Sequence, residues 1–346
     1  MMTPSAHAGE PVQVRPCLLG LGLAHLQLRA DTPYSGHLAK PWCEDVTMLA
    51  ALDQTWMDAS SSWWAKANRA KGHIDSLHRQ VDEFRASAPY SLTPEPTEKP
   101  GRLAYRLRFL KPVPVAISTT IGDVLSNLRA ALESLAFEVA GRSQAGSVTA
   151  RRERVSTFPI CETPQALDDF FNKDRKDRKG LYDKRAQAAF RSVQPFTNLE
   201  EAQRVGIALD KSFSEEFRWD NLQRLDTLWN FDKHRRLTLM TWWPDLISWE
   251  SDGPTNRRAF PGDGTLANES VLLYIEGADE GQGDDLRHQF NLVLTDDPAY
   301  SGKDDGTTDD VVRLLEHWHQ DIVGLVFQRI FTIMSQAVAT AQSPSA

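Results

Sequence analysis

Cysteine is scarce in this chain of 346 residues, which has only Cys17, Cys43 and Cys161. The three residues lie far apart, and any disulfide scheme leaves one of them unpaired. A disulfide scaffold is therefore excluded, and a reducing compartment is the simpler expectation. The first residues also lack the basic stretch that opens a secretory signal, so we expect the protein in the cytoplasm.

Long hydrophobic runs and an excess of positive charge are missing as well. The longest apolar stretch, 17–24, is far shorter than the roughly 20 residues that cross a bilayer, so we expect no membrane span. Lysine and arginine number 39 against 47 acidic residues, and the net charge of −8 gives no general attraction to nucleic acid or anionic lipid. Any binding to a polyanion therefore has to be local.

What the sequence does contain is helical periodicity. Apolar residues recur at three- and four-residue steps in four long segments, and shorter segments favour helices at 163–171 and 182–193. Alternating apolar residues and arginines predict a strand at 103–109, and 237–296 has the pattern of a small antiparallel meander. The four long helices are predicted at 53–86, 118–140, 219–236 and 309–339.

Together these elements predict an α+β protein. We expect a four-helix-bundle core with the small antiparallel sheet inserted before the C-terminal helix. The predicted organisation is an irregular N-terminal arm over 1–50, with one short strand at 17–28, a single domain over 51–340 and a disordered tail over 341–346.

The first candidate motif is GDVLSNLRAALES, which starts at residue 122. On a helix, Asp123, Asn127 and Ser134 share one stripe, while Arg129 and Glu133 are spaced to pair with each other. The stripe could form a binding site. Alternatively, Asn127 satisfies a neighbouring backbone group inside the bundle, and Arg129 and Glu133 form a surface ion pair.

The second candidate motif is NFDKHR, at 230–235. Asp226, Asn230 and His234 follow one another at steps of four, so they share a helix face, with Lys233 beside it. This set could hold a phosphate and supply a general acid or base near neutral pH. In the alternative interpretation the basic residues, Arg235 included, only complement the dipole at the C-terminal end of the helix.

The third candidate lies in the last predicted helix, where Arg313, His317 and Asp321 form one row and His319 lies off it. A zinc protease would need H-E-x-x-H, which this order of residues does not provide. We therefore expect no metal. The nucleotide-binding glycine motifs are also missing, and we expect no cofactor.

The stretch 174–185 carries six basic and three acidic side chains, with Phe170, Phe171 and Tyr182 nearby. It could contact a nucleic-acid backbone. It also fits a solvated charged loop, which needs no ligand.

The stretches 122–133 and 230–235 resemble the two hallmark motifs of a large, mostly uncharacterised bacterial family common in actinobacteria, G-D-x-L-H-N-L-R-x-A-L-D-H and N-x-D-K-H-R. That family in turn resembles HEPN domains, helical bundles in which an arginine and a histidine of one helix often form a metal-independent ribonuclease site across a dimer. This chain departs from the family where Ser126 and Ser134 replace two histidines. The positions that match are Asp123, Asn127, Arg129, Asn230, Asp232, Lys233, His234 and Arg235, with Glu133 in place of Asp.

The resemblance implies an RNA-binding protein or a metal-independent ribonuclease, as a toxin or phage-defence factor and as a homodimer. Arg129 and Lys233 would hold a phosphate, Asn127 would orient it, and His234 would act as general acid or base. Asp123, Asn230 and Arg235 would line the same site. Because Ser126 and Ser134 replace the two histidines of the family, an alternative site is expected at Arg313, His317 and His319.

Two other interpretations remain open. The protein could be a non-catalytic protein-interaction module in which the same polar residues form a buried network between helices. A small-molecule enzyme with a pocket of Trp242, Trp243 and Trp249 has no motif in its support.

Overall fold

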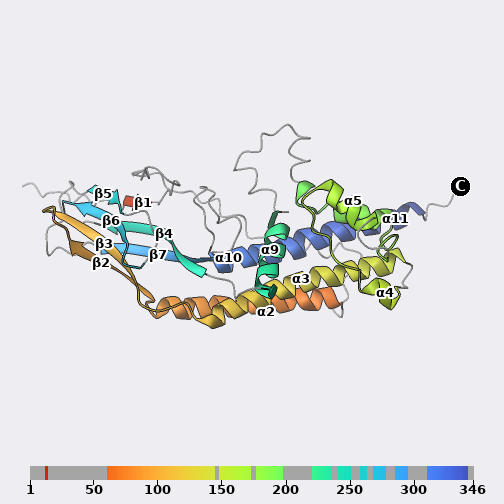
Figure 1. Ribbon diagram of the computed structural model, residues 1–346, viewed down its shortest axis with the longest axis horizontal. Helices are drawn as coiled ribbons and strands as arrows, with labels where there is room; N and C mark the ends of the chain where they lie inside the picture. The colour runs from red at the N-terminus through yellow and green to blue at the C-terminus, as the bar shows by residue number, and fades with distance from the viewer. Residues whose placement is uncertain are drawn as a thin grey trace, which may run out of the picture. The chain divides into compact units, whose positions relative to one another are not determined.

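The structure is a computed structural model whose described residues form a mixture of helices and antiparallel strands (Figure 1). This confirms the predicted α+β class. The predictions for most of the arm, for the strand at 17–28, for the first turns of the helix at 53–86 and for the last tail residues lie outside the described residues. The described ranges are 12–14, 61–144, 148–172, 177–197, 220–234, 240–250, 258–262, 268–277, 285–294 and 310–341.

The chain divides into two compact units. The sheet unit comprises the described residues within 1–36, 79–117 and 239–311, and the helical unit those within 37–78, 118–238 and 312–346. Each unit combines segments that lie far apart in the sequence.

The helical unit contains the four long helices that the periodicity predicts. They are α2 (Ser62–Ala86), α3 (Val115–Ser143), α9 (Asp220–His234) and a C-terminal helix built from α10 (Val311–Gln320), the π-helical η2 (Asp321–Phe327) and α11 (Gln328–Ala341). The last residues of α2 and the first residues of α3 and α10 belong to the sheet unit.

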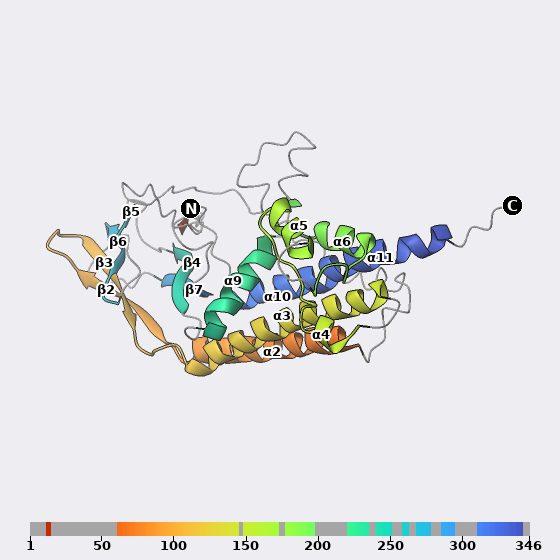
Figure 2. The same ribbon diagram turned by 45° about the vertical axis from the view of Figure 1, so that its right-hand side comes forward.

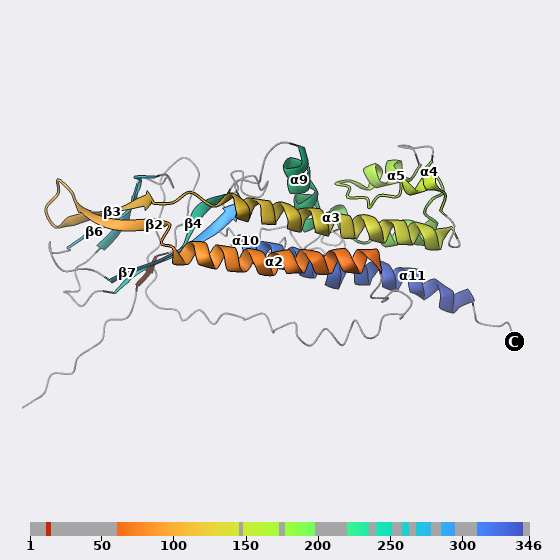
Figure 3. The same cartoon turned by 90° about the horizontal axis from the view of Figure 1, so that it is seen from below.

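Contacts among these helices close a ring. Trp63 of α2 packs edge-on against Phe327 of η2, with ring centroids 5.0 Å apart, and α2 and α3 run side by side (Figure 3). α9 lies across both α3 and α10 (Figure 2), and the Asn221 side chain donates to Asp321 Oδ2 at 2.8 Å. Burial of the apolar stripes in this ring accounts for the helical unit, since helices gain most of their stability from packing.

Short helices surround an aromatic cluster in the same unit. They are α4 (Ala150–Glu153), which the periodicity did not predict, α5 (Pro164–Asn172) and α6 (Lys184–Arg191). Phe171 and Tyr182, which the sequence places beside the basic loop, are buried against Phe158 and Phe190. These two rings are core residues and are not exposed for stacking on nucleobases.

The sheet unit holds two antiparallel sheets, with strand orders β1-β4-β7 and β2-β3-β6-β5. The strands of 237–296 therefore do not form one meander, because β4 pairs with β7 whereas β6 pairs with β3 and β5. Tyr90 of β2 packs on Phe290 of β7, with ring centroids 4.6 Å apart. The strands are β1 (Val12–Val14), β2 (Tyr90–Pro96), β3 (Arg102–Phe109), β4 (Met240–Glu250), β5 (Arg258–Pro261), β6 (Val271–Glu276) and β7 (Asp285–Leu294).

β3 is the predicted strand, and β2 is its unexpected partner. The proline-rich sequence of β2 indicated a connector, yet Pro94 and Pro96 lie in an edge strand. Proline lacks a backbone N–H, and an edge strand tolerates this because one of its sides has no strand partner. Over the described ranges, no helix is both long and apolar enough to span a bilayer.

Candidate functional site at the junction of α3 and α9

The two family-like motifs meet where α9 crosses α3. Gly122 opens the first motif, and a β-carbon placed on it would lie 2.8 Å from Asp232 Oδ2 of the second. Asp232 can approach the backbone of α3 only because position 122 has no side chain. Its pKa is raised, first by burial and then by the nearby Asp123 carboxylate.

Arg129 is the centre of this junction. Its side chain is buried, and it contacts Glu133 Oε1 at 2.7 Å through Nη2 and Asp226 Oδ1 of α9 at 3.3 Å through Nε. Its guanidinium carbon also lies 5.5 Å from the centre of the Trp229 ring, also on α9. The predicted pair with Glu133 therefore forms, with the arginine buried and the glutamate partly exposed.

The pair of Arg129 and Glu133 also holds the chain segment that carries Phe158. Arg129 Nη2 donates to the Phe158 carbonyl at 3.2 Å, and the Phe158 N–H donates to Glu133 Oε2 at 3.1 Å. Two side chains one turn apart thus satisfy both backbone polar groups of one residue, as a neighbouring strand would. Burial raises the pKa of Glu133, while the Arg129 charge and the Phe158 N–H lower it.

The remaining polar residues of α9 are more exposed. Asn230 donates to the carbonyl of Asp226 at 2.8 Å, within its own helix, and Lys233 places its ammonium 4.6 Å from the Trp229 ring centre. His234 is the last residue of α9, and its side chain, like all of Arg235, lies outside the described residues. The predicted roles of these two residues stay predictions.

Two residues of the predicted stripe on α3 contact α2. Asp123 Oδ2 lies 4.0 Å from His73 Nδ1, and Ser134 Oγ accepts a hydrogen bond from Lys66 Nζ at 2.6 Å. Asn127 donates to the Asp123 carbonyl at 2.7 Å within α3. His73 and Lys66 are contacts that sequence reasoning missed, although both lie on the polar side of the predicted first helix.

The third motif does not gather into a site. Arg313 and His317 are exposed, whereas Asp321 is buried and bonded to Asn221. His319 donates from Nε2 to the carbonyl of Ala67, at 3.1 Å, and burial is the main cause that lowers its pKa. His319 therefore bonds within the helix packing, between α10 and α2.

The basic loop places one arginine inside the protein. Arg178 is buried, lies 3.8 Å from the Phe170 ring centre, and donates to the carbonyl of Val155 at 3.1 Å and to Thr157 Oγ1 at 3.3 Å. Together with Arg129 and Glu133 it fixes the 155–158 segment. Its role in the structure described is therefore internal support.

The chemistry open to the junction follows from these pairings. The Arg129 charge is balanced by two carboxylates, so a third anion gains little attraction there. Within the part of the chain that is described, no three histidine, cysteine or acidic side chains are grouped as metal ligands. Searches against models of protein families, against curated proteins and against solved structures found no match for this chain.

Proposed function

We propose that the protein is a non-catalytic interaction module whose polar motif residues fix its helices in place. One observation carries the proposal: Arg129 is buried and paired with Glu133 and Asp226. A phosphate that replaced either carboxylate at Nε or Nη2 would have to break a partly buried ion pair, which opposes its binding there. The arrangement favours a permanent structural role for this arginine.

The amides of the two motifs bond within their own helices and do not themselves connect α3 to α9. The side-chain amides of Asn127 and Asn230 each donate to a carbonyl one turn earlier in their own helix. The HEPN-like four-helix core is part of the proposal, and the ring of contacts through α2, α3, α9 and α10 supports it. In this proposal the module keeps the helical architecture that the motifs imply, without the ribonuclease chemistry.

A metal-independent ribonuclease is the second candidate, and one observation favours it. Nε and Nη1 of Arg129 are buried without a hydrogen-bond partner, although Nε lies close to Asp226. A buried guanidinium rarely leaves donors unused, because each unmet donor costs about 1–3 kcal/mol. A ligand oxygen at Nη1 would remove that cost.

The experiment that separates the two candidates is incubation of the purified full chain with a mixed pool of structured and unstructured RNA in EDTA. The wild type and matched His234→Ala and Arg313→Ala preparations are compared. The proposal predicts that none of the three cleaves RNA. Cleavage that the wild type and Arg313→Ala share and that His234→Ala loses would overturn it in favour of the ribonuclease with His234 in its site.

A further inference from the structure

A local basic surface contrasts with the net charge of −8 of the whole chain. α4 contributes Arg151 and Arg152, Arg154 follows directly as its C-cap, and the segment after Asp177 contributes three further cations at its surface. All but Arg152 are exposed, and Arg152 is partly exposed. The basic surface consists of Arg151, Arg152, Arg154, Lys179, Lys184 and Arg185.

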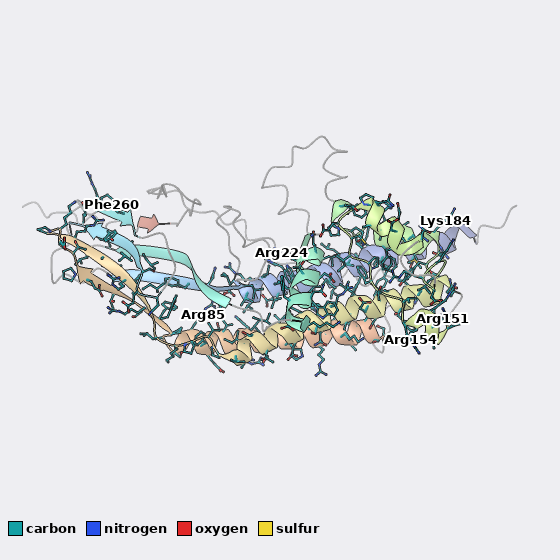
Figure 4. The ribbon with its side chains drawn as sticks, viewed as in Figure 1. Arg85, Arg151, Arg154, Lys184, Arg224 and Phe260 are labelled. Carbon is teal, nitrogen blue, oxygen red and sulfur yellow. The ribbon has the colours of Figure 1, made fainter. Side chains whose placement is uncertain are left out.

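Hydrogen bonds hold the two segments of the basic surface together. Arg151 Nε pairs with Asp177 Oδ2 at 2.8 Å, and Arg152 donates to Gln144 Oε1 at 2.6 Å. Gln144 in turn donates to the carbonyl of Gly180 at 2.8 Å, which fixes the end of α3 to the same segment. Figure 4 shows Arg151, Arg154 and Lys184 at one end of the helical unit. These bonds support the α4 arginines beside the 177–180 segment, and Lys184 lies at the same end of the helical unit.

Over the described ranges, four of these six cations make no ion pair, since only Arg151 and Arg185 pair with a carboxylate, and Arg152 is bonded to Gln144 instead. Among the described residues, Arg154, Lys179 and Lys184 make no ion pair. The arginine-rich face of the β2-β3-β6-β5 sheet is different, because Arg106 and Arg108 both pair with Glu95, at 2.8 and 2.7 Å. Unpaired exposed cations gain the most from an anionic partner, since no existing pair has to be broken.

We infer that the basic surface binds an acidic segment of a partner protein. This rests on the proposed function as an interaction module and names the chemistry of its partner. Guanidinium groups match carboxylates in planar two-bond geometry, and flexible lysines add charge around them. Arg154, Lys179 and Lys184 would meet the partner's carboxylates directly, whereas Arg151 and Arg152 support the surface.

The same surface fits a nucleic acid less well. Glu153, Asp177 and Asp183 lie among the cations, and an even row of phosphates would meet these carboxylates, whereas a peptide can place hydroxyl or amide groups opposite them. Of the three aromatic rings beside this stretch, Phe171 and Tyr182 are buried, and the partly exposed Phe170 has the Arg178 guanidinium 3.8 Å from its ring centre. They offer little platform for bases. A discrete acidic peptide is therefore the partner that this charge pattern favours.

The test measures binding of the full chain by fluorescence anisotropy at low salt. The probes are a fluorescein-labelled peptide in which glutamate alternates with serine, the same peptide with glutamine for glutamate, and labelled single-stranded and duplex RNA and DNA. The first variant is Arg154→Glu, Lys179→Glu, Lys184→Glu. The matched control is Arg69→Glu, Arg79→Glu, Arg329→Glu, which changes the net charge equally at exposed positions elsewhere.

We expect the glutamate peptide to bind, the first variant to weaken binding about tenfold or more, and the control to change it less than about twofold. If the first variant fails to fold, the same three positions changed to glutamine keep the test intact. The inference is overturned if the two variants weaken binding equally or if the glutamate peptide does not bind. It is also overturned if RNA or DNA binds more tightly than the peptide and this binding depends on the same three residues. If the inference fails in one of these ways and the chain also does not cleave RNA in EDTA, the proposed function as an interaction module is unaffected.

Discussion

The Asp232 carboxylate occupies the space that a side chain at Gly122 would need, with Oδ2 2.8 Å from the position of a β-carbon there. Gly122, the first residue of the first motif, thus leaves the space that is occupied by Asp232, the third residue of the second motif. This contact explains why a glycine interrupts the apolar pattern of α3 at a point where the helix itself gains nothing from it. Glycine costs a helix interior about 1 kcal/mol relative to alanine.

We expect Gly122→Ala to lower the free energy of unfolding by up to about 1 kcal/mol, because the Asp232 carboxylate has to rotate out of the space that the added methyl group takes. Gly141→Ala is the matched control in the same helix. A β-carbon there meets nothing within 4 Å, so the change should raise stability by about 1 kcal/mol through helix propensity. Urea unfolding followed by circular dichroism measures both.

The cost of Gly122→Ala should shrink when Asp232 is also replaced by alanine, since the clash partner is then gone. An undiminished cost in that background would show that the contact with Asp232 is not its cause.

A second prediction concerns Arg178, which supports Val155 and Thr157 from inside. Arg178→Met should lower the free energy of unfolding by about 2–4 kcal/mol, because it leaves the carbonyl of Val155 and the hydroxyl of Thr157 without this donor. Lys179→Met, one residue along and fully exposed, should change it by less than about 0.5 kcal/mol. Equal losses in the two variants would mean that Arg178 has no special structural role.

A third prediction uses the lowered pKa of His319. Burial lowers this pKa, the bond to Ala67 opposes the shift, and Lys71 reinforces it. The unfolded chain then binds a proton more readily than the folded one, so stability is complete above the ordinary pKa of about 6.5 and falls as the pH drops through the lower folded value.

His319→Gln keeps a donor for the Ala67 carbonyl and removes the titration. The slope of unfolding free energy against pH below about 6.5 should therefore become flatter than in the wild type. His317→Gln, at an exposed position of the same helix, should keep the wild-type slope. A slope unchanged by His319→Gln would rule out His319 as its source.

The sequence predicts the helices well because their apolar residues recur at three- and four-residue steps over long segments. The strands are harder, and β2 shows the physical reason: the prolines that mark a connector are also tolerated at the edge of a sheet, and only the pairing with β3 distinguishes the two. The short helix α4 is missed for a similar reason, because its four residues have no apolar face to detect.

The candidate site is predicted only in part. The spacing of Arg129 and Glu133 correctly predicts their ion pair, but no local pattern shows that the pair is buried or that it holds Phe158. The partner Asp226 lies on a different helix, and periodicity gives no information on which helices touch. Contacts of this kind depend on tertiary packing, which a single sequence does not specify.

The most direct test of the account is a double-mutant cycle on Arg129 and Asp226. Arg129→Met and Asp226→Asn are made singly and together in the full chain, and the free energy of unfolding is measured with urea. The account predicts a loss of about 3 kcal/mol for Arg129→Met and a coupling energy of about 1 kcal/mol or more between the two changes. A wild-type stability for Arg129→Met, with no coupling to Asp226, would contradict a structural role for this arginine.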